Sequence, residues 1–286
     1  MNIIGGPASQ LLAGRVSKEK KSNLLVSEFK RFPDGELYTR ILGDLSGEKV
    51  TIIQSTVSDS DFISLLQLID ACQEASMIDV VIPYMGYARQ DKIFKSGEPI
   101  SARAMAKAVK ADHIYTVNIH AKSILDYFDG KAADLDATPV IGKYIKSMEL
   151  ENPLIIAPDD GAIGLAQNAS SDLGLDYDFL EKTRLSGDTV TLKPKNIAVK
   201  GRDVIIIDDI ISTGGTMAET IALLRNQGAH EVFIACIHPV LSSNAVLKLF
   251  KAGMKGMIAT DTIDKGVSAV SVAPVIADAL TYNPHP

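Results

Sequence analysis

The sequence predicts an α/β protein of two similar domains, each built on a mainly parallel β-sheet flanked by helices. Short apolar runs rich in β-branched residues alternate along the chain with amphipathic stretches of helical period. This alternation is typical of right-handed βαβ units, which lay helices over the faces of a parallel sheet. A chain of 286 residues is long for one core and suits two domains of about 140 residues each.

The apolar runs define the expected strands. The run 204–207 consists of four β-branched apolar residues, which predicts a strand buried on both faces, as in a parallel sheet. The expected strands in chain order are 50–53, 80–82, 114–119, 154–157, 204–207, 232–237 and 256–259. The expected helices between them are 62–75, 101–109, 162–173 and 217–227.

The two halves of the chain share a pattern. A strand at 50–53, a polar loop, a helix and a second strand near 80 parallel the series that begins at 204–207. A segment with Pro139, Gly142 and a charged run is the expected link between the halves, so we place the domain boundary near residue 145. The predicted domains are therefore 1–145 and 146–286.

The repeat is informative where it fails. Gln54 and Ser55 stand in the first half where Asp208 and Asp209 stand in the second, and no double glycine follows them. The first half therefore lacks the acidic pair and is available for a different ligand.

Composition favours a globular protein, with 46% hydrophobic and 22% charged residues. The net charge of −6 argues against a nucleic-acid partner, which normally requires a basic excess. No run of 18 apolar residues occurs and the N-terminus has no signal-like pattern, so we expect a cytoplasmic protein with no membrane association. Cys72 and Cys236 lie in apolar patterns, and no disulfide is expected.

The segment 204–219, VIIIDDIISTGGTMAE, carries the strongest site signal. Asp208 and Asp209 come at the carboxyl end of the strand, where open α/β sheets bind ligands. A loop of glycines and hydroxyls then opens a helix, whose free N–H groups and positive end attract phosphate. Carboxylates for a diol or a metal beside a phosphate loop predict a sugar-phosphate site. The loop residues are Ser212, Thr213, Gly214, Gly215 and Thr216.

Two segments of the first half are rich in polar groups. One is a turn with a Pro-Asp-Gly core, and the other follows the strand 80–82. Taken singly, each is typical of a surface loop. Their candidate residues are Phe32, Asp34, Gly35 and Glu36 in the first, and Arg89, Gln90 and Asp91 in the second.

Three further segments complete the pattern. His120 ends the strand 114–119, and Asp159 follows the strand 154–157. Lys182 and Arg184 lie two residues apart; on an extended segment they would face the same side, as a clamp on one phosphate chain needs. Taken singly, His120 is typical of a satisfied polar side chain, and Lys182 and Arg184 are typical of a solvated hairpin.

Together and in this order, these motifs resemble those of the ribose-phosphate pyrophosphokinases over essentially the whole chain. Phosphoribosyltransferases share the acidic pair and its loop. They generally lack the FPDGE motif (residues 32–36) and the RQD motif (residues 89–91). The resemblance implies two phosphoribosyltransferase-like domains. It also implies transfer of the diphosphoryl group of ATP to the C1 hydroxyl of ribose 5-phosphate, giving 5-phosphoribosyl 1-pyrophosphate and AMP.

The resemblance also implies a role for each motif. Phe32 would stack on adenine, and the remaining ATP contacts would come from Asp34, Gly35, Glu36, Arg89, Gln90 and Asp91. Asp208, Asp209, the loop Ser212–Thr216 and Arg184 would bind ribose 5-phosphate. Lys182 and Arg184 would be catalytic, and His120 and Asp159 would bind Mg²⁺, the expected cofactor.

The chain departs from the family at Asp160 and Ala162, where the pyrophosphate loop more often has a small residue and a second glycine. The added charge would weaken polyphosphate binding or add a water-mediated metal contact. Two alternative functions stay open: a phosphoribosyltransferase and a non-catalytic regulatory homologue. The presence of Lys182, Arg184 and His120 favours catalysis. By resemblance we expect a homo-oligomer, a dimer or larger.

Overall fold

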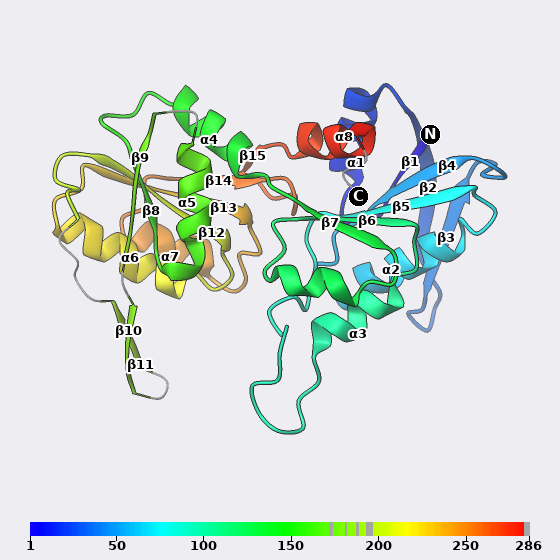
Figure 1. Cartoon of the computed structure of the whole chain (residues 1–286), viewed down its shortest axis with the longest axis horizontal. Coiled ribbons are helices and arrows are strands. Elements are labelled where there is room, and N and C mark those ends of the chain that lie inside the picture. Colours follow the sequence, from blue (N-terminus) through cyan, green and yellow to red (C-terminus); the bar gives the residue numbers. More distant parts are fainter. Residues whose placement is uncertain (172–173, 181, 187–188, 193–196, 283–286) are drawn as a thin grey trace. The chain divides into compact units, whose positions relative to one another are not determined.

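The computed structural model describes residues 1–171, 174–180, 182–186, 189–192 and 197–282, with the side chains of 182–192 and 282 left aside. The chain forms two compact units (Figure 1). The first comprises Met1–Asp136, Thr262–Asp264 and the residues from Ser271 onward. The second comprises Ala137–Asp261 and Lys265–Val270.

The first unit has a seven-stranded sheet in the order β3-β2-β1-β4-β5-β6-β7, parallel except for the β2–β3 pair. Figure 1 shows α1 and α8 on one face of this sheet and α2 and α3 on the other. The strands are β1 (Asn2–Gly5), β2 (Asn23–Arg31), β3 (Leu37–Leu42), β4 (Lys49–Ile53), β5 (Met77–Ile82), β6 (His113–Val117) and β7 (Lys131–Leu135). The helices are α1 (Gln10–Lys20), α2 (Asp59–Asp70), α3 (Ser101–Ala108), the 3₁₀ helix η1 (Lys122–Tyr127) and α8 (Ala273–Tyr282).

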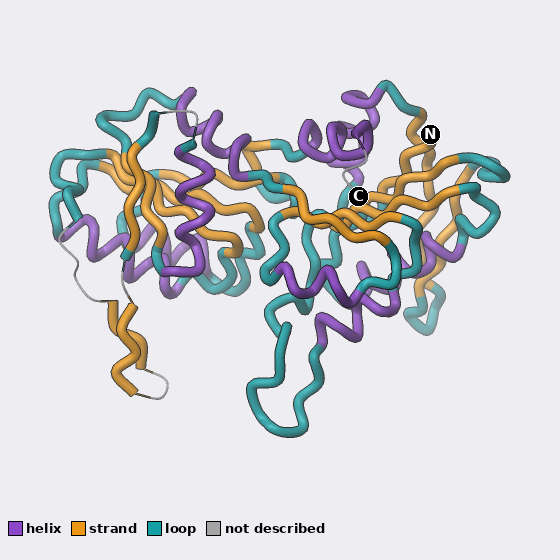
Figure 2. Tube along the Cα trace, viewed as in Figure 1, coloured by secondary structure: helices purple, strands orange, loops and turns teal. Residues whose placement is uncertain are grey.

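The second unit has a six-stranded, fully parallel sheet in the order β15-β14-β13-β12-β8-β9, with helices on both faces (Figure 2). Its strands are β8 (Leu154–Ala157), β9 (Asp176–Phe179), β12 (Asp203–Ile210), β13 (Glu231–His238), β14 (Gly256–Thr260) and β15 (Ser268–Val270). Its helices are α4 (Thr138–Ser147), η2 (Asp160–Ala162), α5 (Ile163–Ser170), α6 (Gly215–Asn226) and α7 (Ala245–Lys251). A separate antiparallel hairpin joins β10 (Lys182–Ser186) to β11 (Thr189–Leu192).

The predicted α/β class with two mainly parallel sheets is confirmed. All seven expected strands occur, and β12 is buried from Val204 to Ile207, as the run of β-branched residues predicted. Complete burial of such a side chain stabilises the fold by about 1.5 to 3 kcal/mol. This central strand therefore holds its carboxyl end, and the acidic pair on it, in a rigid frame.

The internal repeat is also present. Val50 pairs with Ile78 across β4 and β5, and Val204 pairs with Val232 across β12 and β13. The strand-to-strand spacing is therefore identical in the two units, and Ile78, not Val80, is the counterpart of Val232.

The division of the chain differs from the expected boundary near residue 145. That position lies inside α4, and the chain passes between the units at Asp136 and Ala137. Pro139 lies in the first turn of α4, where its missing N–H and fixed φ are compatible with a helix, so it begins a helix where a linker was expected.

The C-terminal helix departs further from a simple division. α8 belongs to the first unit and packs on α1, with Lys20 Nζ donating to Thr281 Oγ1 at 2.6 Å. The domain range 146–286 therefore loses its last segment to the other unit. An apolar helix pattern indicates burial but carries no information about which of two sheets it covers.

Candidate active site

The acidic pair, Asp208 and Asp209, lies on β12 itself and is followed by the last residue of the strand, Ile210. Their carboxyl groups interact with each other, both by charge and by a side-chain hydrogen bond. Each is half-buried, and each carboxylate accepts the backbone N–H of the next residue, at 2.9 Å for Asp208 and 2.7 Å for Asp209. These short contacts fix both side chains against the main chain.

Asp159 lies close enough to act on this pair. It follows β8, caps η2, and accepts the Gly161 N–H at 3.1 Å. Burial, followed by the charges of Asp209 and Asp159, raises the pKa of Asp208 to about 8. Three carboxyl groups therefore gather at one edge of the second sheet, where hydroxyl donors or a cation would relieve their repulsion.

The loop after β12 has the form of an anion site. Gly214 has φ of +73°, and Gly215 is the first residue of α6. Within the described residues, nothing accepts a hydrogen bond from the backbone N–H groups of 213–216. The beginning of a helix normally leaves such donors unpaired, and they bind phosphate well. The loop Ser212–Thr216 therefore presents donors a few residues from the acidic pair.

Cys236 lies on β13, the strand next to the acidic pair. It pairs in register with Asp208 across β12 and β13 and is fully buried. Burial and the charges of the two aspartates raise its pKa, so the thiol stays protonated. Cys236 supports the packing of the strand and is not a nucleophile.

Lys182 and Arg184 lie on β10, opposite Leu192 and Val190 of β11, with an irregularity in the pairing after Arg184. The extended backbone that the i, i+2 spacing requires is present. Their side chains, and residues 181, 187 and 188, lie outside the described part of the structure.

The FPDGE turn connects β2 to β3. Its backbone closes through Phe32 N–H to Glu36 O and Gly35 N–H to Phe32 O, both at 2.9 Å, with Gly35 at φ +95°. Phe32 is half-exposed, with its ring edge-on to Tyr38 at 5.9 Å between centroids. The turn therefore displays an aromatic face and the exposed carboxylates of Asp34 and Glu36.

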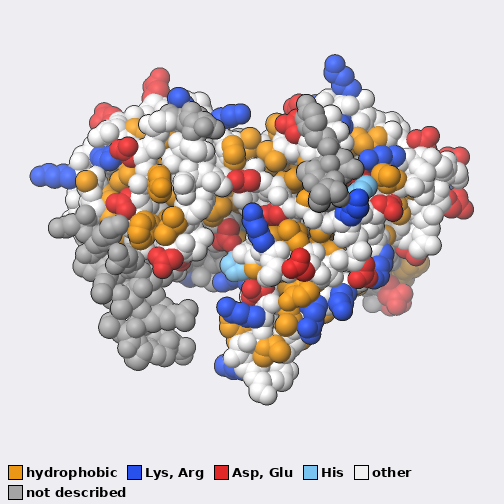
Figure 3. Space-filling model, viewed as in Figure 1, with side chains coloured by type: hydrophobic (Ala, Val, Ile, Leu, Met, Phe, Trp, Pro, Cys, Tyr) orange, Lys and Arg blue, Asp and Glu red, His pale blue; other side chains and the backbone are white. Residues whose placement is uncertain are grey.

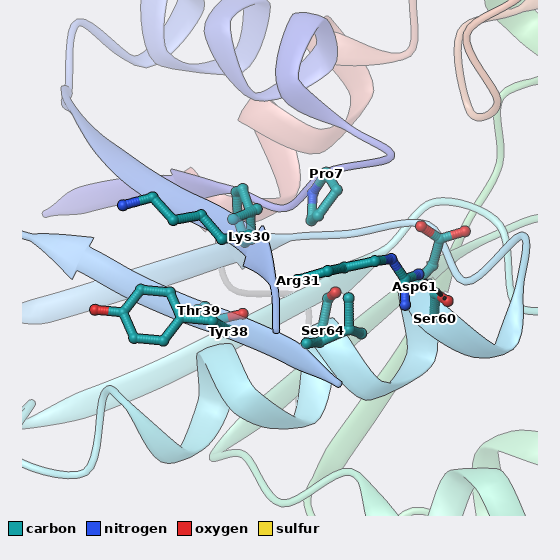
Figure 4. Close-up of a pocket in the computed structure, with 10 residues that line it drawn as sticks. Pro7, Lys30, Arg31, Tyr38, Thr39, Ser60, Asp61 and Ser64 are labelled. Atoms are coloured by element: carbon teal, nitrogen blue, oxygen red, sulfur yellow. Dashed lines mark hydrogen bonds between the residues drawn. The ribbon is translucent and has the colours of Figure 1, made fainter. Parts of the chain in front are cut away.

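Sequence reasoning missed the neighbours of this turn. Gly35 and Glu36 line a pocket with Asp59 and Ser60 from the first turn of α2. Arg31 links the FPDGE turn to the first turn of α2. Its guanidinium group donates to Ser60 Oγ at 2.8 Å (Figure 4) and to Gly35 O at 2.7 Å. The signal in the sequence was the capping box that begins at Ser58.

The RQD motif follows β5 and leads toward α3. The Gln90 side-chain oxygen accepts the Ser101 hydroxyl, and Gln90 O accepts Ala102 N–H at 3.2 Å. Tyr87, at φ +62°, donates its hydroxyl to Asp59. Because Asp59 also lines the pocket of the FPDGE turn, Tyr87 connects the two candidate ATP motifs through one side chain. Arg89 is exposed and Asp91 is half-buried.

His120 is exposed in the bend after β6. Two backbone contacts to β7 hold this bend: Asn118 N–H donates to Leu135 O, and Ile119 N–H donates to Asp134 Oδ1, both at 2.9 Å. Burial raises the pKa of Asp134. His120 therefore lies on a loop that the Asp134 carboxyl group helps to hold in place.

Asp159 and the acidic pair offer the carboxylate oxygens that Mg²⁺, a hard cation, prefers, whereas the His120 imidazole is a softer donor. No cluster of three or more His, Cys, Asp or Glu able to enclose a metal occurs in the part of the chain that the structure describes. The repulsion that raises the pKa of Asp208 is what a bound cation would relieve. His120 and Asp159 belong to different units.

The surface carries mixed charge. On the face shown in Figure 3, basic and acidic side chains are interspersed over both units. Among the described residues, no helix combines the length and apolar character that crossing a bilayer requires. Both cysteines are buried and unpaired.

Comparison with known proteins first defines the class. Residues 123–271 match a family model described as a phosphoribosyl transferase domain. Residues 1–112 match the N-terminal domain of ribose phosphate pyrophosphokinase. The chain belongs to the ribose-phosphate pyrophosphokinase family.

The relatives are similar over nearly their full length. The ribose-phosphate pyrophosphokinase of Methanosarcina mazei is 58% identical over 98% of this chain and 95% of its own. That of Methanosarcina acetivorans is 59% identical over 98% and 99%. The crystal structure of phosphoribosylpyrophosphate synthetase from Mycobacterium smegmatis has a TM-score of 0.83, with 31% identity and 98% of both chains covered.

Proposed function

We propose that this protein is a ribose-phosphate diphosphokinase that converts ATP and ribose 5-phosphate into 5-phosphoribosyl 1-pyrophosphate and AMP. The observation that carries the proposal is the combination of two sites in one chain. The second unit has an acidic pair beside a phosphate loop, and the first has an aromatic turn and a polar loop joined through Asp59.

The reaction forms a bond between the C1 oxygen of the sugar and the β-phosphorus of ATP. The bond from that phosphorus to the oxygen shared with the α-phosphorus breaks, AMP leaves, and the C1 hydroxyl loses its proton. Catalysis of such a transfer consists mainly of positioning and charge stabilisation.

The proposed roles in the second unit follow its geometry. Asp208 and Asp209 accept hydrogen bonds from sugar hydroxyls, and the unpaired N–H groups of 213–216 bind the 5-phosphate. Lys182 and Arg184 stabilise charge on the transferred phosphates. His120 and Asp159 would each hold a separate Mg²⁺, which would neutralise phosphate charge when bound.

The proposed roles in the first unit concern ATP. Phe32 offers a half-exposed ring for adenine, and the bond to Ser101 leaves the Gln90 NH₂ group available to the nucleotide. Asp34, Glu36 and Arg89 are exposed and Asp91 is half-buried, and we assign all four to ATP binding. We further propose that the protein acts as a homo-oligomer in the cytoplasm.

The deciding experiment is product analysis. With ATP, Mg²⁺ and ribose 5-phosphate, the protein should release AMP at a rate that depends on both substrates. Formation of ADP in place of AMP would refute diphosphoryl transfer, and the absence of any product would favour a regulatory homologue.

The acidic pair provides a test of the assigned sugar site. Replacing both Asp208 and Asp209 by Asn keeps their size but removes charge and acceptor capacity. The Kd for ribose 5-phosphate should rise at least about tenfold, as expected for loss of hydrogen bonds to charged groups, with ATP affinity unchanged. An unchanged Kd for the sugar phosphate would exclude the pair from the site.

A further inference from the structure

The phosphate loop is held from behind by the segment that follows β13. Ile211 N–H donates to His238 O at 3.2 Å, and Leu241 N–H donates to Ile211 O at 2.9 Å. Ser242 N–H donates to Ser212 O at 3.1 Å, and the Ser212 and Ser242 hydroxyls are 3.0 Å apart. Hydrogen bonds thus join residues 211–212 to the segment 238–242.

The contacts occupy the carbonyl groups of the loop one after another. Those of Ile211 and Ser212 accept from Leu241 and Ser242, and the Gly214 carbonyl accepts from Ala218 at 2.9 Å. The Thr213 carbonyl is 3.5 Å from Lys248 Nζ, at the limit of hydrogen-bond distance. Four consecutive carbonyl oxygens therefore have partners, while the N–H groups of 213–216 have none among the described residues.

This division matters for an anion. A carbonyl oxygen that turned into the loop would repel phosphate, whereas each N–H attracts it. Binding sites gain affinity when their donors are oriented before the ligand arrives. The partners of the carbonyls therefore control how many donors the loop presents.

The supporting segment has an uncommon backbone conformation on either side of Ser242. Leu241 and Ser243 both adopt left-handed conformations, with φ of +49° and +56°. This conformation is unfavourable for residues other than glycine and persists where surrounding contacts impose it. Ser242, between them, directs both its N–H and its hydroxyl at Ser212.

We propose that Ser242 and Lys248 are positioning residues for the sugar-phosphate loop. They act through the carbonyl groups of Ser212 and Thr213 and the Ser212 hydroxyl, and they orient the loop's N–H groups toward the 5-phosphate. The proposal rests on the proposed function of this loop, but its test uses ribose 5-phosphate alone and needs no turnover.

The first experiment compares Ser242→Ala with Ser147→Ala, which removes the same atom from an exposed residue of α4 in the same unit. One hydrogen bond is worth about 1 kcal/mol. Calorimetric titration should therefore show about a five- to tenfold higher Kd for ribose 5-phosphate in Ser242→Ala. In Ser147→Ala the Kd should stay within about twofold of the native value, and ATP should bind both variants normally.

The second experiment does not depend on the fold tolerating a change at Ser242. Lys248→Met keeps the aliphatic chain of an exposed side chain, and Lys251→Met is the control on the same helix. We expect about a three- to tenfold higher Kd for ribose 5-phosphate in Lys248→Met alone.

A double-mutant cycle with Ser212→Ala locates the effect. If Ser242 acts through Ser212, the double variant should be little weaker than either single one. The proposal is overturned if Ser242→Ala and Lys248→Met bind ribose 5-phosphate as the native protein does, or if ATP affinity falls equally. A native protein that binds ribose 5-phosphate but releases no AMP would refute the proposed function alone.

Discussion

The folded protein holds Asp208 in surroundings that disfavour its charged form. Its carboxyl group is half-buried beside Asp209 and within the field of Asp159, and its pKa rises to about 8 for these reasons. A carboxyl whose pKa is higher in the folded protein binds more protons when folded. The free energy of unfolding therefore falls as pH rises from about 4 to about 8.

Asp208→Asn removes this penalty because the amide does not ionise. Without substrates, the variant should be more stable than the native protein at pH 8, by about 1 to 3 kcal/mol. The difference should vanish below about pH 3, where the native carboxyl is largely protonated in both states. Thermal unfolding across this range measures it, and equal stability at pH 8 would contradict the assigned burial and repulsion.

The corresponding residue of the first unit has the opposite character. Gln54 is fully buried, accepts Ala8 N–H at 3.1 Å, and donates to Asp61 O at 3.2 Å. Ser55 is equally buried and donates its hydroxyl to Thr262 O at 2.5 Å. The polar groups at this strand end serve the fold, which explains why the repeat retains the strand but not the acidic pair.

At the scale of elements, the loop that opens α6 depends on one glycine. Gly214 has φ of +73°, and a Cβ there would lie 3.3 Å from Leu249 Cγ. Gly214→Ala should destabilise the protein by at least about 1 to 2 kcal/mol and weaken ribose 5-phosphate binding. Gly215→Ala is the stability control, since a Cβ there meets nothing within 4 Å. Urea unfolding of both variants checks this, and equal stabilities would show that the loop tolerates a side chain.

The hairpin β10–β11 tests the assignment of the catalytic cations. Loss of a charge that acts mainly in the transition state costs about 3 to 4 kcal/mol, or roughly a hundred- to thousandfold in rate. Lys182→Ala should therefore bind both substrates within a few-fold of the native protein and turn over at least about a hundredfold more slowly. Lys251→Ala is the control, and near-native turnover in Lys182→Ala would mark β10–β11 as a solvated hairpin.

The sequence predicted seven of the parallel strands, because a strand buried on both faces, such as 204–207, leaves a continuous apolar run. The short parallel strands β1, β7, β9 and β15 were not predicted. The sequence also did not reveal β2 and β3, whose faces are partly exposed and whose pattern is therefore weak. Of the sites, the segment around Asp208 was legible because its chemistry is contiguous. Asp59 and Ser242 were not, since each acts on a motif that lies far away in the chain.

At the scale of the molecule, each unit has its own core, and the first is completed by the C-terminal helix. Ile276 of α8 is fully buried. Ile276→Ala should cost about 2 to 5 kcal/mol, whereas Asp278→Ala, on the exposed side of the same helix, should change stability by less than about 0.5 kcal/mol.

Ile276→Ala also tests whether ribose 5-phosphate stabilises the second unit independently of the first. Ribose 5-phosphate should raise the unfolding temperature of the second unit in Ile276→Ala as it does in the native protein, because a ligand stabilises only the state that binds it. Calorimetric scans with and without ribose 5-phosphate measure this. Loss of that shift would show that the second unit depends on the packing of α8.

The return of the chain to the first unit has a consequence for biosynthesis. The ribosome joins residues from the N-terminus, so every segment of the second unit has been synthesised by Val270, before α8 is made. The face of the first sheet that α8 covers together with α1 stays incomplete until α8 has been synthesised. The unit assigned to the sugar phosphate is therefore the first whose segments are all made, and the unit assigned to the nucleotide, although its synthesis starts earlier, is completed after it.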